Sequence, residues 1–246
     1  MVRSKIEDRI NEFESLFNRG LSDYKIGKLM GFNHATIFQF RKKHGYIRDS
    51  LKENKEVNPT QEELEILVGT LLGDSTLRVT GNSNPSFSCA HGIKQKEYAE
   101  YKTALLVRLG ATCTYHKRNI PDKRNGVYYE DYTIRLKANP AFKELYNMLY
   151  VNGTKILSED ILDYFSERSL AFMFMDDGGK IGRGYTIATN CFNEEDIKRF
   201  RLFLFEKFNL ETSMFKSKVL YVHAKSKNQF KQLIMPYICE SMKYKL

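Results

Sequence analysis

The chain has 246 residues, of which 42% are hydrophobic and 13% aromatic, and its formal net charge is +9. This hydrophobic content is sufficient for a folded core and excludes a largely disordered chain. The positive charge favours a polyanionic partner, nucleic acid before an anionic membrane surface.

The cysteines and the N-terminal region exclude further classes. Cys89, Cys113, Cys191 and Cys239 lie far apart and form no CxxC pair, which argues against a zinc ribbon and against a disulfide framework. No apolar run approaches the roughly 18 to 20 residues that a membrane span needs, and the first residues contain no apolar signal core. We therefore expect an intracellular, soluble protein without a membrane partner, in a bacterial or phage-infected cytoplasm or in an organelle.

Residues 1–48 are predicted to form a separate helical module. A helix over 4–18 precedes a second helix over 21–30, for which Ser22 is the predicted N-cap. A turn that contains glycine leads to a third helix over 34–44 with a basic end. This arrangement is typical of a helix-turn-helix that binds DNA. The alternative is a small helical cap that packs on the main body with solvated charges.

The third helix of this module has a predicted outward face. If Ile37 and Phe40 face inward, Thr36, Gln39 and Lys43 face outward, where they could meet base edges or phosphates. These three residues are therefore predicted DNA contacts.

The main body is predicted to begin after a polar linker over 49–60. Thr60 followed by Glu63 is a capping-box signature for a helix that runs to Asp74. The elements expected after it are strands over 76–80 and 86–90, a helix over 95–109, strands over 112–118 and 128–137, and a helix over 140–149.

The rest of the chain repeats this order. The elements expected after Asp177 are a strand over 185–189, a helix over 194–208, strands over 211–216 and 219–224, and a helix over 228–235. Phe-Lys-Glu-Leu at 142–145 and Phe-Lys-Gln-Leu at 230–233 also repeat in sequence. We therefore expect a pseudo-two-fold α+β fold with halves 61–156 and 157–246.

Each half starts with an apolar run that ends on an acid and a small residue. The two runs are Leu-Val-Gly-Thr-Leu-Leu-Gly-Asp-Ser at 67–75 and Leu-Ala-Phe-Met-Phe-Met-Asp-Asp-Gly at 170–178. A helix C-terminus carries partial negative charge, so an anion there is disfavoured unless a positive group lies close by. The occurrence of this arrangement in both halves predicts two matched cation sites.

These two runs resemble the nine-residue motif of the LAGLIDADG homing endonucleases, in their single-chain form with two motifs. Met-Asp-Asp-Gly-Gly-Lys at 175–180 and the segment 236–246 are similar to a branch that includes a yeast mitochondrial intron-encoded endonuclease. The resemblance covers about residues 60–246 and leaves the helix-turn-helix as an appended module. It implies two motif helices that pack along the pseudo-two-fold axis, with Gly69 and Gly73 allowing close approach. It also implies that the strands of each half form an antiparallel β-saddle in the DNA major groove.

The resemblance implies a metal site at the ends of these helices. Asp74 and Asp177 match the eighth motif position, and two neighbouring carboxylates resist ionisation until a hard cation relieves their repulsion. The expected ion is Mg²⁺, with Mn²⁺ as a substitute, and the main-chain carbonyl of Gly73 is a further candidate ligand. Asp176 is also a candidate, although we expect it to face away and to bond locally.

The family also has basic residues near each active centre. Lys245 matches the terminal Tyr-Lys-Leu element, and Lys155 is its expected counterpart in the first half. Leu157 stands where family members often have proline. The alternative for either lysine is a solvated surface position.

Strand alternation predicts further DNA contacts. In the strand that contains Ile134 and Leu136, the apolar residues face the helices while Arg135 and Lys137 face DNA. The other candidates are basic or histidine residues on strands or in turns of both halves: Arg78, His116, Arg118, Arg183, Lys216 and His223. The alternative for each is a solvated strand face.

The sequence thus predicts a monomeric, Mg²⁺-dependent, site-specific endonuclease that makes double-strand breaks in double-stranded DNA by phosphodiester hydrolysis. One alternative is an RNA maturase that binds its host intron RNA and assists splicing. Another is a transcription regulator that has kept the scaffold without cleaving.

Overall fold

The chain divides into two units, residues 1–55 and 56–246, and each has its own hydrophobic core. The structure is a computed structural model that describes residues 6–46 and 57–246. Most of the predicted linker 49–60, and the first part of the predicted first helix, therefore lie outside the described residues. None of the described helices is long and apolar enough to cross a membrane.

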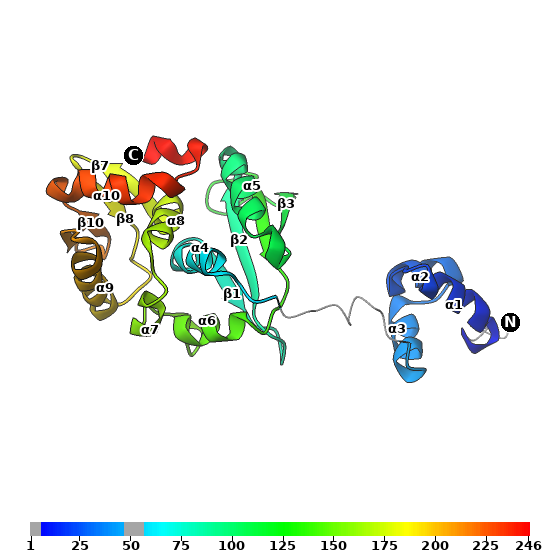
Figure 1. The fold of residues 1–246 in the computed structure, drawn as a ribbon. Helices are drawn as coiled ribbons and strands as arrows, with labels where there is room; N and C mark the ends of the chain where they lie inside the picture. The colour runs from blue at the N-terminus through cyan, green and yellow to red at the C-terminus, as the bar shows by residue number, and fades with distance from the viewer. Residues whose placement is uncertain (1–5, 47–56) are drawn as a thin grey trace. The chain divides into compact units, whose positions relative to one another are not determined.

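The described residues of the first unit, 6–46, form three short helices, which Figure 1 labels. They are α1 (Ile10–Asn18, preceded by a 3-10 turn at Ile6–Arg9), α2 (Asp23–Met30) and α3 (His34–Lys43). Ser22 caps α2 as predicted, because its hydroxyl accepts from the Lys25 amide. Gly31 adopts φ +75°, a left-handed conformation that ends α2 and starts the turn. Ile37 and Phe40 are buried in the core of this unit.

The second unit begins with α4 (Gln61–Leu72), and the predicted capping box between Thr60 and Glu63 is present. A four-stranded antiparallel sheet with the order β1-β2-β4-β3 follows. The elements after α4 are β1 (Thr76–Arg78), β2 (Ser86–Gly92), a 3-10 turn (Ile93–Gln95), α5 (Lys96–Leu105), a 3-10 turn (Val107–Leu109), β3 (Thr112–Lys117), β4 (Glu130–Leu136) and α6 (Phe142–Leu149).

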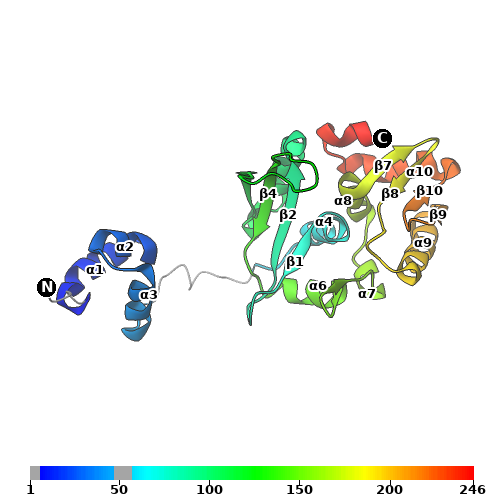
Figure 2. The ribbon, with the colours of Figure 1, turned by 180° about the vertical axis from the view of Figure 1, so that it is seen from behind.

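The second half repeats this topology with the sheet order β7-β8-β10-β9, again antiparallel (Figure 2). A short connection contains β5 (Tyr150–Val151), β6 (Thr154–Lys155) and α7 (Glu159–Leu162). The repeated elements are α8 (Glu167–Asp177), β7 (Gly178–Ile181), β8 (Gly184–Ile187), α9 (Glu194–Phe208), β9 (Thr212–Met214), β10 (Leu220–Val222) and α10 (Lys227–Ile234). Three 3-10 turns, at Ala224–Ser226, Met235–Tyr237 and Glu240–Lys245, flank or follow α10.

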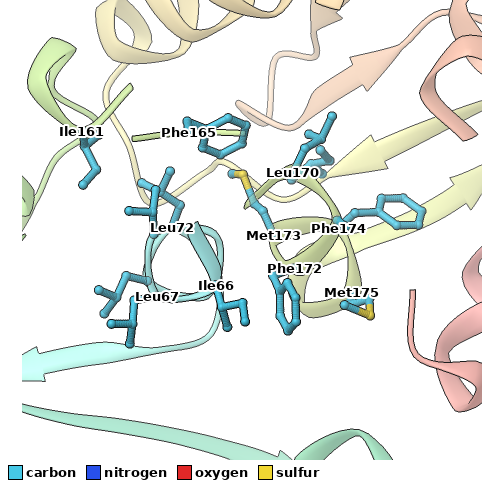
Figure 3. Packing of buried hydrophobic residues seen from close by; sticks show 14 of the residues in the cluster. Ile66, Leu67, Leu72, Ile161, Phe165, Leu170, Phe172, Met173, Phe174 and Met175 are labelled. Atoms are coloured by element: carbon cyan, nitrogen blue, oxygen red, sulfur yellow. The ribbon is translucent and has the colours of Figure 1, made fainter. Parts of the chain in front are cut away.

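Helices α4 and α8 lie side by side and join the two halves (Figures 1 and 2). We call the boundary between them the seam. Figure 3 shows Phe172 next to Ile66 at the seam, whereas Phe174 points away from α4 into the second half. Gly69 allows the close approach that the sequence predicted, because a Cβ there would lie 2.3 Å from the Ser169 carbonyl oxygen. Helix α4, which ends near Asp74, is therefore packed directly on α8, which ends at Asp177.

The close packing of α4 on α8 predicts that position 69 tolerates only glycine, which can be tested. In Gly69→Ala the new methyl group meets the α8 backbone, and overpacking of this kind costs about 1–3 kcal/mol or more. The helix-propensity gain of about 1 kcal/mol offsets only part of this cost. We expect the free energy of unfolding, measured with urea, to fall by about 2 kcal/mol. Gly92→Ala is the matched control, because its Cβ would meet nothing within 4 Å; equal stability of the two variants would contradict the close seam.

Some elements differ from the sequence prediction. Helix α4 ends at Leu72, so Asp74 lies in the turn after the helix rather than in its last turn. Strand β7 was not predicted, because Gly178 and Gly179 have low strand propensity and sheet pairing decides their conformation instead. The short α7 was also not predicted, since four residues carry too weak a periodic signal.

Candidate active site

Asp74 and Asp177 stand at the C-terminal ends of the seam helices and interact with one another. Burial, and then the negative charges of Asp74 and Asp176, raise the pKa of Asp177 to about 7. Burial, and then the charge of Asp176, also raise the pKa of Asp74. Asp74 still reaches solvent, and Asp177 is half-buried. The structure therefore brings the two predicted carboxylates into one centre that is open to a ligand.

Lys155 and Lys245 provide the positive charge that an acid at a helix C-terminus needs close by. Lys155 Nζ donates to the main-chain oxygens of Gly73, at 3.3 Å, and Ser75, at 2.8 Å. Lys245 Nζ donates to those of Met175, at 2.6 Å, and Asp176, at 2.9 Å. Each lysine thus binds carbonyls at the end of one seam helix, where the helix dipole favours a cation.

Both lysines are half-buried and belong electrostatically to the same centre. Burial lowers the pKa of each ammonium, while the nearby carboxylates act in the opposite direction. Lys155 interacts with Asp177 and Asp74, and Lys245 interacts with both acids as well. All four residues predicted to be catalytic are therefore brought together.

The donor atoms of this centre fit a hard divalent cation. The centre offers carboxylate oxygens with raised pKa values and main-chain carbonyl oxygens, and hard cations such as Mg²⁺ prefer such ligands. The Gly73 carbonyl, a predicted ligand, accepts from Lys155 at the long distance of 3.3 Å.

The expectation for Asp176 requires a correction. Asp176 does not face away or bond locally: its carboxylate is buried in the seam, and its partners are Lys102, Thr70 and Tyr98 from the first half. Although burial acts to raise it, the pKa of Asp176 lies below its ordinary value because Lys102 and these hydrogen bonds stabilise the anion.

Asp176 also lies near Asp74 and His91. One ligand atom from each of these residues falls within 4.8 Å of the others, a spacing that could hold a metal ion. The Lys102 ammonium, however, already provides the cation for the Asp176 carboxylate. Burial, and then the charge of Lys102, lower the pKa of His91 to about 4, so the imidazole is neutral. Asp74 and Asp177 therefore remain the better candidate ligands.

Sequence reasoning missed Lys102, Tyr98 and Thr70. Lys102 and Tyr98 are four positions apart on α5, so they lie on the same helix face. That face also carries Ala99 and is buried. A lysine at a core position of an amphipathic helix is the signal that could have identified the buried partner of Asp176.

The first sheet presents Arg78 and Arg135 on its outward face. Both are exposed, whereas Ile134 and Leu136 are buried, as the alternation predicted. Arg135 stands opposite Ser88 on β2 and Thr112 on β3, which gives this face a polar strip.

The other candidates of the first half lie at strand ends. Lys137 is exposed just beyond β4. His116 is half-buried, and its Nε2 has no hydrogen-bond partner among the described residues. Arg118 is exposed, and its Nε lies 3.9 Å from the Asp131 carboxylate, which partly neutralises the charge of the guanidinium.

The candidates of the second half lie at the ends of its sheet. Arg183 is exposed in the turn between β7 and β8, and Lys216 is exposed in the turn between β9 and β10. His223 follows β10, and its ring centroid lies 5.6 Å from that of Tyr221.

In the first unit, the three predicted DNA contacts on α3 share one surface. Thr36, Gln39 and Lys43 are all exposed, and they line a common hollow together with Arg9 and Asn33.

The fold is a duplicated α+β scaffold, because the two halves are alike and each has an open antiparallel sheet. It has a single composite site, because two carboxylates share one centre at the seam. A sequence model described as the LAGLIDADG DNA endonuclease family matches residues 64–233. The chain therefore belongs to this family, as its motifs predicted.

Relatives and a solved structure agree with this membership. The chain is 32% identical over 210 residues to the "Cytochrome b mRNA maturase bI2" of Debaryomyces hansenii, covering 80% of this chain and 78% of that protein. It is 30% identical over 213 residues to the "Probable intron-encoded endonuclease 1" of Wickerhamomyces canadensis, covering 81% and 89%. The homing endonuclease I-WcaI bound to its DNA recognition sequence matches with a TM-score of 0.74 and 27% identity, over 82% of this chain and 94% of that one. The predicted fold class is confirmed.

Proposed function

We propose that this chain is a site-specific endonuclease that makes double-strand breaks in DNA with the help of divalent cations. The observation that carries the proposal is the shared centre of Asp74 and Asp177, each beside a lysine that binds the end of its helix. Because one chain supplies both acids, a single copy is sufficient for a cut in each strand.

The residues of the centre have distinct roles in this proposal. Asp74 and Asp177 would hold the cations, which when bound would activate a water and stabilise the departing oxygen. Lys155 and Lys245 hold the helix ends in place, and their positive charge lies where negative charge develops on the phosphate. The Gly73 carbonyl is an additional oxygen ligand.

The outward faces of the two sheets are the proposed DNA-binding surface. A β-ribbon fits the major groove and can distinguish base pairs there. Arg78 and Arg135 suit guanine edges or phosphates, and the remaining candidates described above, at the sheet ends, suit phosphates. The cleavage proposal is tested by incubating the purified chain with Mg²⁺ and a plasmid that carries its own insertion site. Linear plasmid supports the proposal, whereas intact plasmid at every Mg²⁺ and Mn²⁺ concentration refutes it.

The first unit is proposed to bind DNA through the α3 surface. This unit lies outside the residues that the family model matches. Its Thr36, Gln39 and Lys43 share an exposed surface, and α3 has a basic last turn without an acid in its first turn. A helix of this kind is suited to the major groove in a helix-turn-helix.

Lys43→Ala in the full chain tests this role. We expect weaker binding to duplex DNA and a salt dependence whose logarithmic slope is smaller by about one, because one phosphate contact is lost. Deletion of residues 1–48 should lower the slope further. The measurement is a binding titration at several salt concentrations. Lys28→Ala, an exposed lysine on α2, is the control; an unchanged slope in Lys43→Ala and in the deletion would refute a DNA role for this unit.

RNA maturase activity is the second candidate function. It is favoured by the relative from Debaryomyces hansenii, which is named a maturase. The same basic surface could bind a folded intron, and the two activities are compatible in one chain. Splicing of the host intron in vitro, with and without the protein, separates this activity from cleavage.

A further inference from the structure

A lysine from the first half is buried against an acid from the second half next to the proposed active centre. The side chains of Lys102 on α5 and Asp176 on α8 are both 0% exposed. Lys102 Nζ lies 2.8 Å and 3.1 Å from the two Asp176 carboxylate oxygens. Neither side chain is required for the metal-binding or DNA-binding roles proposed above, so the pair calls for its own explanation.

The pair belongs to a saturated hydrogen-bond network. Tyr98 donates to one Asp176 oxygen and Thr70 to the other, each at 2.7 Å. Lys102 also donates to the Thr70 hydroxyl at 2.7 Å. Thr70 has one hydroxyl hydrogen, which Asp176 receives, so Ser75 must be the donor in its 2.7 Å contact with Thr70. The network therefore extends from α5 through α8 to the turn after α4.

The ends of this network are the chain neighbours of both proposed metal ligands. Ser75 directly follows Asp74, and Asp176 directly precedes Asp177. Both neighbours are also held through their main-chain oxygens, since the active-site lysines donate to them at 2.8 Å and 2.9 Å. Each proposed ligand thus has a neighbour that is fixed at its side chain and at its main chain.

Stability alone is a poor explanation for a buried ion pair at this place. Desolvation of two charges costs so much that apolar residues of similar volume often give equal or higher stability. The pair also occupies one side of the seam only, because the motif counterpart of Asp176 is Gly73. The Gly73 position has no room for a side chain, since a Cβ there would lie 2.7 Å from the Asp176 Cβ.

We propose that Lys102 is a positioning residue for cleavage. Through Asp176 on one side and Thr70 and Ser75 on the other, it fixes the spacing of Asp177 and Asp74 for the two cations. This inference rests on the proposed endonuclease function.

The decisive comparison uses Lys102→Met and the double variant Lys102→Met/Asp176→Leu. The single variant leaves a buried carboxylate without its cation and should melt at a clearly lower temperature. The double variant removes both charges but leaves the buried Tyr98 and Thr70 hydroxyls without their acceptor, so it should melt between the single variant and the parent. We expect its turnover on target DNA to fall about a hundredfold, because small misplacements of reacting groups have effects of that size. Its KM for DNA should stay unchanged, and its affinity for Mn²⁺, measured by electron paramagnetic resonance without DNA, should fall several-fold.

Two further variants separate the positioning role from a general loss of stability. Tyr98→Phe keeps the ion pair and removes one hydrogen bond to Asp176, so it should fold and still lose turnover several-fold. Arg168→Met is the matched control, because Arg168 pairs with Glu62 and Glu65 at the opposite end of the same helix pair. It should lose stability and keep the parent turnover.

The outcomes are distinguishable. Parent-like turnover and Mn²⁺ affinity in the double variant, or parent-like turnover in Tyr98→Phe, overturn the positioning role. An equal loss of turnover in Arg168→Met also overturns it. If the parent chain never cleaves DNA, the endonuclease function is refuted instead. The positioning role of Lys102 is then tested by Mn²⁺ affinity, and equal affinities in the parent and the double variant refute that role.

Discussion

Asp177→Asn and Asp74→Asn should each lower double-strand cleavage by at least about a hundredfold, while DNA binding stays within a few-fold of the parent. An amide keeps the shape of the carboxylate but carries no negative charge, so the cation near that strand is bound weakly. The proposed DNA-binding surface lies on the sheets and is not altered. The measurement is the rate of plasmid linearisation beside a binding titration in Ca²⁺.

The control for this prediction is Asp163→Asn. Asp163 is an exposed acid next to α7, and its replacement should change neither rate nor binding. Because each acid serves one strand in the proposed mechanism, a single variant that accumulates nicked plasmid would agree with it. Full double-strand cutting by either variant would remove that residue from the mechanism.

The second large effect is a pH-dependent metal requirement. The pKa of Asp177 is about 7 in the absence of metal, raised by burial and then by Asp74 and Asp176. Below that pH a proton competes with the cation for the same carboxylate. We expect the Mg²⁺ concentration for half-maximal cleavage to rise about tenfold for each unit that the pH falls below 7, and to level off above it. A requirement that stays constant from pH 6 to pH 8 would contradict the raised pKa.

The same pKa can be measured without DNA or metal. Between the ordinary value of 3.8 and about 7, the folded chain holds a proton on Asp177 that the unfolded chain has lost. Stability from this group therefore falls as the pH rises through that window, and none of it remains above pH 7. Metal-free Asp177→Asn should melt at a higher temperature than the parent at pH 8, and at nearly the same temperature at pH 4. A substitution that abolishes cleavage and stabilises the fold is typical of a functional centre.

The sequence predicted the fold well because duplicated periodic patterns are strong signals. The long amphipathic helix α9 was predicted at its observed bounds, and both four-stranded sheets were expected apart from β7. The glycine spacing predicted close approach of the two seam helices, and the structure shows this approach at Gly69. Short elements such as α7 depend on tertiary contacts, which no local pattern reveals.

The candidate site was only partly predictable. Asp74, Asp177 and the two lysines could be named because each belongs to a motif or to a matching chain segment. The core position of Lys102 on α5 signals a buried charge, but its pairing with Asp176 could not be predicted, because Asp176 lies 74 positions away and comes from the other half. The partner of a buried charge depends on how the halves dock, and a linear pattern does not encode that contact directly.

The last 3-10 turn, Glu240–Lys245, contacts α5 of the first half and β7 of the second. It carries the lysine that binds the end of α8. The proposed centre therefore gains this lysine only after both halves have folded and the segment 240–245 has docked across them, so that folding of either half by itself leaves it incomplete.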